Sequence, residues 1–244
     1  MATYNFSTIT ADEAADFTAG ADSYLYLGTN DADTTTFDLA GRDSIVNTFE
    51  GDDDITLTGS GFANVTLGDE DDTVDGTAAT GALNIFGGLG EDEIDGGTSG
   101  DHLYGFGFGA AASDDDDDVI NGNGGNDYIQ GNAGNDELNG DDGRDRINGG
   151  GDNDIINGDA GNDTVNGNKG DDSIDGGTGT DSLLGGQGED TINGGGDNDI
   201  ISGDRGDDTV NGDGGGDLLR GADGNDLVSG GTGDDVVYGD ADED

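Results

Sequence analysis

The chain of 244 residues contains no cysteine, no proline and only six basic residues. Without cysteine it has no disulfide and no thiolate site, and without proline it has no rigid linker between domains. The six basic residues are scattered, so nucleic acid, whose phosphates require clusters of Lys and Arg, is not an expected partner. The N-terminus lacks the basic start and the apolar run of a signal peptide, and no apolar stretch approaches the length of a membrane span, about 18 residues. We therefore expect neither a signal peptide nor a membrane span.

Acidic residues dominate the composition. The 58 Asp and Glu residues give a formal net charge of −52, and only 29% of the chain is hydrophobic. Such a chain repels itself and has too few apolar side chains for an ordinary globular core, so we expect it to be largely unfolded until cations bind. A salt-adapted host would also favour acidic residues, but it would not produce a nine-residue repeat.

A nine-residue repeat runs without a break from Gly122 to Tyr238, in thirteen copies. Each copy has Gly at the first place, usually Gly at the fourth, Asp at the sixth, and Ile, Leu or Val at the eighth. A glycine-rich turn that ends in a carboxylate and leads into a short strand is the unit of a calcium-binding β-roll. The predicted fold class is therefore all-β: a right-handed parallel β-roll (solenoid) with an irregular β-rich N-terminal region.

The sequence predicts two regions. Residues 1–86 contain short alternating runs separated by Gly, Asp and Thr, and we expect an irregular β-rich capping region there. Residues 87–244 form the predicted β-roll, in which the nonapeptides of 122–238 are regular. A shortened motif at 68–75 indicates that the two regions share one stack. A capping box at 10–13 predicts one or two helical turns near the start.

One motif of the predicted roll carries an insertion. The motif that begins at Gly105 has eight extra residues before the register returns at Asp118. We therefore expect about 107–117 to leave the roll as a loop, which is either a solvated excursion or a contact for a partner or an extra cation.

A longer repeat is superimposed on the short one. Residues 151–167 recur at 196–212 with three changes, a step of five motifs. Because consecutive motifs are expected on opposite sheets, this odd step places the copy on the other face of the roll. A face that recognised one ligand would be scrambled by such a step, so the long repeat favours a structural or cation-loading role.

The glycine–aspartate nonapeptides resemble the RTX (repeats-in-toxin) family of type I secreted bacterial proteins, strongly over 122–238 and moderately over 87–121. In that family two motifs make one coil, and each Ca²⁺ lies between turns stacked on the same side, held by carboxylates and turn carbonyls. The resemblance implies that the sixth-place aspartates bind metal. These are Asp92, Asp101, Asp118, Asp127, Asp136, Asp145, Asp154, Asp163, Asp172, Asp181, Asp190, Asp199, Asp208, Asp217, Asp226 and Asp235.

The same pairing predicts the number of ions. Thirteen regular motifs give seven turns on one edge and six on the other, with six and five gaps between them, so we expect about eleven or more Ca²⁺. Eleven divalent ions would change the formal charge from −52 to about −30, so folding and metal binding should be one event. Hard oxygen ligands favour Ca²⁺ over Zn²⁺, and the flexible turn disfavours octahedral Mg²⁺. Asp152 and Asp197 replace the fourth-place Gly, which puts the turn geometry there in doubt.

Two surfaces are candidates for self-association. Seventh-place residues should face outward, so Ile200, Leu218 and Val236, each two motifs after the one before, are predicted to form an exposed apolar row with Tyr238 beside it. The row reflects either ordinary strand propensity or a docking face. The C-terminal coil is also expected to lack a cap, which leaves its backbone groups open to another chain.

Two functions remain open. One is a calcium-dependent structural protein, secreted or on the cell surface of a bacterium, that self-assembles into a surface layer, filament or matrix. The other is a folding and secretion module of a larger exoenzyme, toxin or adhesin. We do not expect an enzyme, because the single histidine, His102, occupies an outward place and no zinc or nucleophile motif is present. We do not expect an ice-binding protein either, because the residues at the third place of the motif vary too much to form a flat, regular face.

Overall fold

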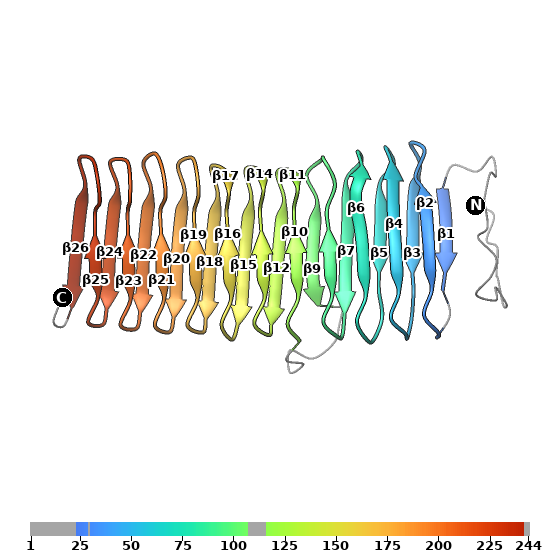
Figure 1. Cartoon of the computed structure of the whole chain (residues 1–244), viewed down its shortest axis with the longest axis horizontal. Coiled ribbons are helices and arrows are strands. Elements are labelled where there is room, and N and C mark those ends of the chain that lie inside the picture. Colours follow the sequence, from blue (N-terminus) through green and yellow to red (C-terminus); the bar gives the residue numbers. More distant parts are fainter. Residues whose placement is uncertain (1–22, 29, 107–115, 242–244) are drawn as a thin grey trace.

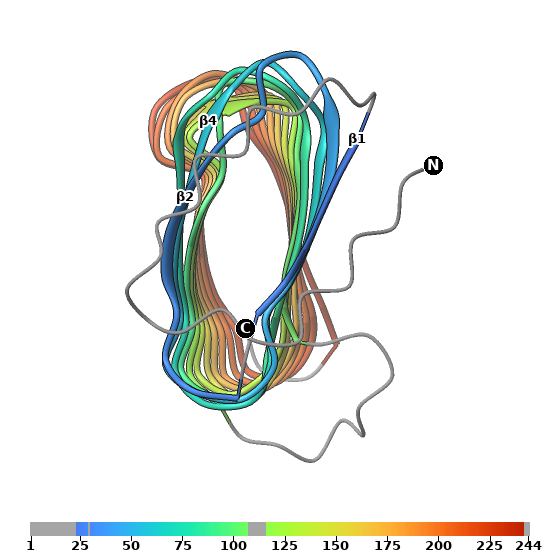
Figure 2. The same ribbon diagram turned by 90° about the vertical axis from the view of Figure 1, so that its right-hand side faces the viewer.

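The computed structural model describes residues 23–28, 30–106 and 116–241. These residues wind as a parallel β-solenoid whose coils stack along one long axis (Figure 1). Viewed along that axis, each coil is a flattened loop with strands on its two long sides (Figure 2). The helical turns predicted after residue 13 lie outside the described residues, as does most of the predicted loop at 107–117.

Two long sheets form the sides of the solenoid, and the chain passes from one to the other at every turn, as predicted. The first sheet has 12 strands: β1 Ser23–Leu27, β3 Asp43–Asn47, β5 Ala63–Thr66, β7 Leu83–Gly88, β9 His102–Phe106, β12 Tyr128–Ala133, β15 Arg146–Gly151, β18 Thr164–Lys169, β20 Ser182–Gln187, β22 Ile200–Arg205, β24 Leu218–Asp223 and β26 Val236–Ala241. The second has 11: β2 Thr34–Asp38, β4 Asp54–Gly59, β6 Thr73–Ala79, β8 Glu93–Asp95, β10 Val119–Asn121, β13 Glu137–Asn139, β16 Ile155–Asn157, β19 Ser173–Asp175, β21 Thr191–Asn193, β23 Thr209–Asn211 and β25 Leu227–Ser229. A short third sheet joins β11 Gly124–Gly125, β14 Asp142–Gly143 and β17 Ala160–Gly161 along one row of turns.

The pairing register follows the length of each coil. In the nonapeptide region Tyr128 pairs with Arg146, two motifs further along the chain. Across the insertion His102 pairs with Tyr128, so this coil is longer by the eight inserted residues.

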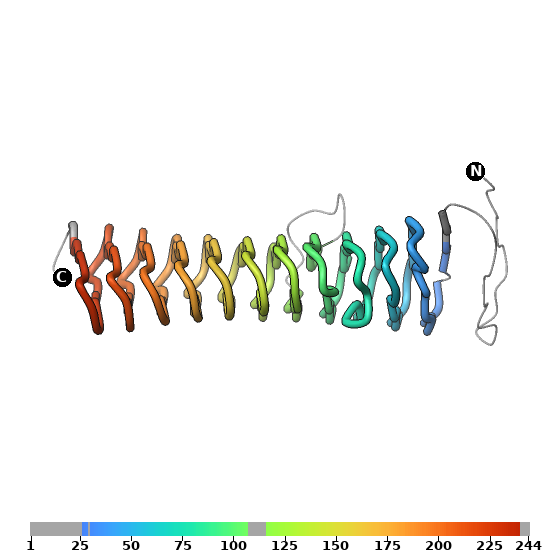
Figure 3. The backbone as a smooth tube through the Cα atoms, turned by 90° about the horizontal axis from the view of Figure 1, so that it is seen from above, coloured from blue at the N-terminus to red at the C-terminus, as the bar shows by residue number. Residues whose placement is uncertain are grey.

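Upstream coils are one or two residues longer than two motifs, as shown by the pairs Ser44 with Ala63 and Ser23 with Asp43. The coils before residue 87 nevertheless belong to the same stack as the roll, which confirms the continuity indicated by the sequence. Figure 3 shows the coils following one another without a break. The capping role of 1–86 stays a prediction.

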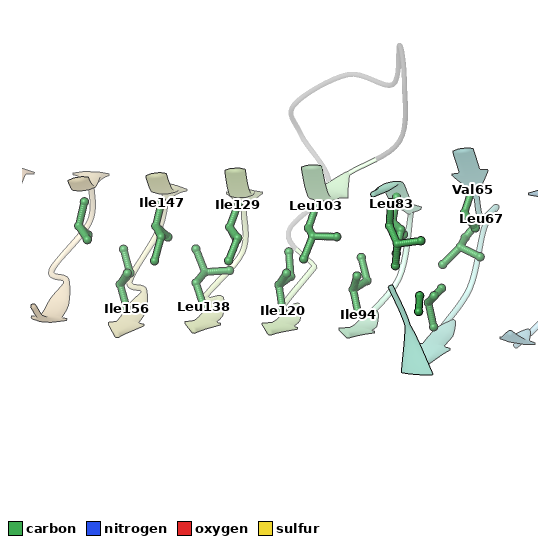
Figure 4. Packing of buried hydrophobic residues seen from close by; sticks show 14 of the residues in the cluster. Val65, Leu67, Leu83, Ile94, Leu103, Ile120, Ile129, Leu138, Ile147 and Ile156 are labelled. Atoms are coloured by element: carbon green, nitrogen blue, oxygen red, sulfur yellow. The ribbon is translucent and has the colours of Figure 1, made fainter. Parts of the chain in front are cut away.

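The core consists of one inward side chain from each short strand. Eighth-place residues such as Ile129 and Leu138 point between the sheets, in two opposed rows (Figure 4), and are buried as far as Leu219. The burial of this row ends near the C-terminal coil, where Val228 is half-buried and Val237 is 46% exposed, because no described coil packs beyond it. The longer upstream coils hold a second inward side chain on some strands. One example is Leu57, two residues after Ile55 in β4.

The two copies of the long repeat lie on opposite sheets, as predicted. Ile155 begins β16 of the second sheet, whereas its counterpart Ile200 begins β22 of the first. Both side chains face outward and are more than half exposed. The two copies therefore place matching outward isoleucines on opposite faces of the solenoid.

Candidate metal centre

The sixth-place aspartates stack in two rows, one at the turns before each long sheet. In each row the backbone N–H of one aspartate donates to Oδ1 of the next aspartate one coil further, over 2.6–3.1 Å. The first ladder contains Asp101, Asp127, Asp145, Asp163, Asp181, Asp199, Asp217 and Asp235. The second ladder contains Asp53, Asp72, Asp92, Asp118, Asp136, Asp154, Asp172, Asp190, Asp208 and Asp226.

The second carboxylate oxygen of most ladder aspartates is buried without a hydrogen-bond partner. This holds for Oδ2 of Asp53, Asp92, Asp127, Asp136, Asp145, Asp154, Asp163, Asp172, Asp181, Asp190, Asp199, Asp208, Asp217 and Asp226. A buried carboxylate oxygen without a partner costs free energy, so it demands a proton or a cation. Two rows of such oxygens, repeated at every coil, fit a row of hard cations.

Turn carbonyls lie beside these oxygens. A Cβ built on Gly194, at the first place of its motif, would stand 2.6 Å from Oδ2 of Asp199 and 2.9 Å from the carbonyl oxygen of Gly212. Carboxylate and carbonyl oxygens from two successive coils therefore lie within 3 Å of the same position, which Cδ1 of Ile201 also approaches, at 3.0 Å. Among the described residues, no three acidic, His or Cys side chains gather as a metal cluster, so a bound ion needs the carbonyls as well. Oxygen donors of this kind suit Ca²⁺.

Burial shifts the ladder carboxyls toward the protonated form. It raises the pKa of Asp92 to about 9 and those of Asp118 and Asp154 to about 8. The hydrogen bond from the preceding backbone N–H lowers each pKa in part, and neighbouring carboxylates raise it further. A bound cation would reverse this shift, because it favours the ionised carboxylate.

Three predicted ligands differ from the others. Both oxygens of Asp101 accept hydrogen bonds, Oδ1 from Leu83 N–H at 2.7 Å and Oδ2 from Gly97 N–H at 2.6 Å. The Oδ2 atoms of Asp118 and Asp235 are also not among the buried, unpaired oxygens. Asp118 lies in the second ladder directly after the insertion, and Asp235 is half-buried in the last described coil. The structure thus brings all sixteen predicted aspartates into two ladders but leaves Asp101 without a spare oxygen.

The aspartates that replace the fourth-place Gly preserve the turn. Asp152 and Asp197 have φ of 71° and 72°, in the left-handed region that glycine occupies at most other fourth places. The doubt about turn geometry at these two places is therefore removed.

Two classes of turn residue were not predicted from the sequence. Asp53 and Asp72 join the second ladder upstream of the nonapeptides, and the signal that could have found them is an aspartate two residues before a buried Ile55 or Val74.

Fifth-place Asn or Asp side chains form another series. Their Oδ1 atoms accept from the fifth-place N–H one coil further, over 2.6–3.1 Å. Nine of the thirteen motifs have Asn or Asp at this place, which was the available signal.

The residues predicted to face outward do so in the structure. Ile200 pairs with Leu218, which pairs with Val236, and these side chains are 55%, 41% and 47% exposed. His102 is exposed on β9 with its ring 5.9 Å from that of Tyr128. The part of the chain that the structure describes has no helix with the length and apolarity to cross a membrane.

A parallel β-solenoid with two rows of buried carboxylates at its turns defines a repeat protein whose turns present oxygen donors suited to cations. A sequence profile for the RTX calcium-binding nonapeptide repeat (4 copies) matches residues 113–147, 139–174, 148–183, 175–210, 184–219 and 211–244. These matches together cover more than half of the chain. The chain therefore belongs to this family of calcium-binding repeats.

One similar solved structure is the X-ray crystal structure of a hyperactive, Ca²⁺-dependent, β-helical antifreeze protein from an Antarctic bacterium. The two sequences are 19% identical, the match covers 92% of this chain and 86% of that one, and the TM-score is 0.40. No curated protein sequence matches the chain. At this level the similarity does not extend to function.

Proposed function

We propose that this chain is an extracellular structural protein of a bacterium that folds when Ca²⁺ ions bind between its turns and then self-associates into a surface layer, filament or matrix. The observation that carries the proposal is the pair of aspartate ladders, whose buried Oδ2 atoms lack hydrogen-bond partners along the whole nonapeptide region. A chain with net charge −52 and a core of one side chain per strand needs such cations to become compact.

The sixteen sixth-place aspartates from Asp92 to Asp235 are the proposed side-chain ligands, together with turn carbonyls. The regular array has six gaps along one ladder and five along the other, which supports about eleven ions. Bound Ca²⁺ would supply the positive charge that the buried carboxylates lack. The aspartates would hold each ion between two coils, and the backbone N–H bonds to Oδ1 would keep successive coils in register.

The outward apolar row supports self-association. Ile200, Leu218 and Val236 lie on three adjacent strands of the first sheet, and Tyr238, 54% exposed, lies beside the last. A second copy covering this row would bury apolar surface that the isolated chain leaves in water. The same row would also serve a neighbouring domain if the chain acts as the folding module of a larger secreted protein.

Analytical ultracentrifugation with parallel circular dichroism tests the proposal. In EDTA we expect an expanded monomer with little β-structure, and in millimolar Ca²⁺ we expect β-structure and larger species. A compact calcium-loaded monomer would retain calcium-driven folding but favour the folding and secretion module. If Ca²⁺ changes neither signal, the proposal is wrong.

A further inference from the structure

The two aspartate ladders have different lengths. The first ends at Asp101, because the corresponding places in the three preceding coils are Leu83, Ala63 and Ser44. The second continues through Asp72 and Asp53, upstream of every residue that the family profile matches. One row of turns therefore carries ladder carboxylates in coils where the other has none.

Asp53 has the geometry of a nonapeptide aspartate. Its Oδ1 accepts from Asp33 N–H at 2.6 Å, and its own N–H donates to Oδ1 of Asp72 at 2.7 Å. The residue is 2% exposed, and its Oδ2 has no partner within hydrogen-bond distance. Burial raises the pKa of Asp53, and the nearby Thr48 hydroxyl, which is also unpaired, lowers it only in part. Asp154 in the regular array shows the same arrangement, with one oxygen in the ladder and the other buried and unpaired.

The turn before Asp53 retains most of the nonapeptide pattern. Thr48 stands at the first place, Gly51 at the fourth with φ of 109°, and Ile55 is the inward eighth-place residue. The carboxylate of Glu70, from the next coil, reaches this turn and accepts from Gly51 N–H at 2.9 Å. Acidic groups from two successive coils thus meet at one turn, as they do in the nonapeptide array.

We propose that the second ladder binds an additional Ca²⁺ between the turns that carry Asp53 and Asp72, whereas the first ladder has no site upstream of Asp101. The proposal rests on the proposed calcium binding of the nonapeptide turns. It extends the cation row along one edge into the coils that precede the repeats, where the unpaired Oδ2 of Asp53 is the anchoring ligand. Asp72 has no spare oxygen, because its Oδ1 accepts from Asp53 N–H and its Oδ2 from Gly68 N–H at 3.2 Å, so turn carbonyls must supply the remaining donors. The N-terminal coils then depend on calcium as the roll does.

Counting bound Ca²⁺ by native mass spectrometry tests this site in the full chain. Asp53→Asn keeps an Oδ1 acceptor for Asp33 N–H but removes the charge, so we expect one ion fewer than in the wild type. Asp54→Asn is the matched control, because it removes the same charge from an exposed neighbour and should leave the count unchanged.

Asp163→Asn, in the nonapeptide array, separates the two proposals. If Asp163→Asn loses an ion while Asp53→Asn and Asp54→Asn both match the wild type, the upstream site is refuted and the proposed function stands. If neither Asp53→Asn nor Asp163→Asn loses an ion, calcium binding by the ladders fails altogether, and the upstream site with it.

A second measurement uses a tyrosine beside the site and does not depend on the folding of Asp53→Asn. Burial, then the charge and hydrogen bond of Asp33 and the charge of Asp53, raise the pKa of Tyr26 to about 12. The Asp33 N–H in turn donates to Oδ1 of Asp53, so Tyr26 belongs to the same coil edge as the proposed ligand. Terbium ions bound at Asp53 should be sensitised by Tyr26. We therefore expect Tyr26→Phe, which keeps the ring that packs on Phe37, to lose part of the tyrosine-excited emission at equal bound terbium. Unchanged emission would overturn the site.

Discussion

At the first place of the nonapeptide, glycine is required by space. Gly194 does not have a positive φ, yet a Cβ there would stand within 3 Å of both the Asp199 carboxylate and the Gly212 carbonyl. Two residues on, a Cβ at Gly196 would meet nothing closer than 4.0 Å. The two glycines therefore have different roles within one turn: Gly194 leaves room for the oxygens that converge on the proposed ion.

Gly194→Ala should lower the free energy of unfolding of the calcium-loaded chain by about 1–3 kcal/mol, because the added methyl group overpacks the turn. It should also weaken calcium binding, since the Asp199 carboxylate must move. Chemical denaturation at fixed Ca²⁺ and calcium titration would measure both effects. Gly196→Ala is the control and should stay near the wild type; equal losses in both variants would contradict the assignment.

In most motifs the fourth place has a left-handed backbone, and Asp197 adopts it at a cost. Non-glycine residues in this region lose about 1 kcal/mol or more relative to relaxed backbone. The φ of Asp197, 72°, is nevertheless close to that of its counterpart Asp152, so the same compromise occurs in both copies of the long repeat.

Asp197→Gly should raise the stability of the calcium-loaded chain by about 0.5–1 kcal/mol, because glycine reaches this φ without steric strain. Asp197→Asn separates charge from conformation, since it removes the charge but remains a non-glycine residue in the left-handed region. Calcium-dependent thermal unfolding would rank the three proteins. A gain in Asp197→Asn as large as that in Asp197→Gly would show that charge repulsion, and not backbone strain, is relieved.

At the scale of the coil, the sequence predicts structure only where the period is constant. From Gly122 each nonapeptide carries its own turn, strand and inward residue, so the fold, sheet alternation and ladder membership could be derived. Before Gly87 the coils vary in length and exceed two motifs by one or two residues, so no fixed register exposes the sixth places. Asp53 was not identified because Thr48 replaces the first-place Gly, and Asp72 because its turn is one residue shorter.

The nine-residue repeat did not predict the hydrogen bonds between coils either. Sixth-place carboxylates accept from the coil before them, whereas fifth-place side chains accept from the coil after them; Asp154 and Asn153 are neighbours that do so in opposite directions. The direction of each bond depends on the side-chain rotamer and turn geometry, which a repeat pattern does not specify. Together the two series tie each turn to both of its neighbours.

Without calcium, protonation of the ladder carboxyls should stabilise the folded state. Burial raises the pKa of ladder carboxyls from the ordinary 3.8 to about 6 for Asp145 and about 9 for Asp92. A carboxyl whose pKa is raised by folding stabilises the folded state fully below its unfolded pKa, and that contribution is lost as the pH rises through the folded value. In EDTA, β-structure should therefore increase when the pH falls from about 8 to about 6, where unperturbed carboxyls stay ionised.

Calcium should reverse this pH dependence, because protons compete with Ca²⁺ for the same carboxylates. Circular dichroism over the same pH range, with EDTA and with limiting Ca²⁺, would show opposite signs. His102→Gln is the control, because it removes the one histidine of the chain. The same sign in both conditions would contradict the ladder explanation.

For the whole molecule, charge and apolar surface act in opposite directions. The net charge of −52 keeps separate chains apart, and each bound Ca²⁺ reduces that repulsion. The row of Ile200, Leu218 and Val236 then becomes available for contact between rods whose charge has been partly neutralised. Association should consequently require calcium twice, once to fold the strands that present the row and once to lower the charge between copies.

Replacing Ile200, Leu218 and Val236 together by Thr should leave calcium-driven folding intact, because Thr already occupies the outward place at Thr164 of the same sheet. The variant should remain a compact monomer at calcium concentrations where the wild type forms larger species. Sedimentation velocity would measure this, with Leu227→Thr as the control, since Leu227 is an exposed apolar residue of the second sheet. If the triple variant assembles as the wild type does, the first sheet is not the contact face, and the row reflects strand propensity alone.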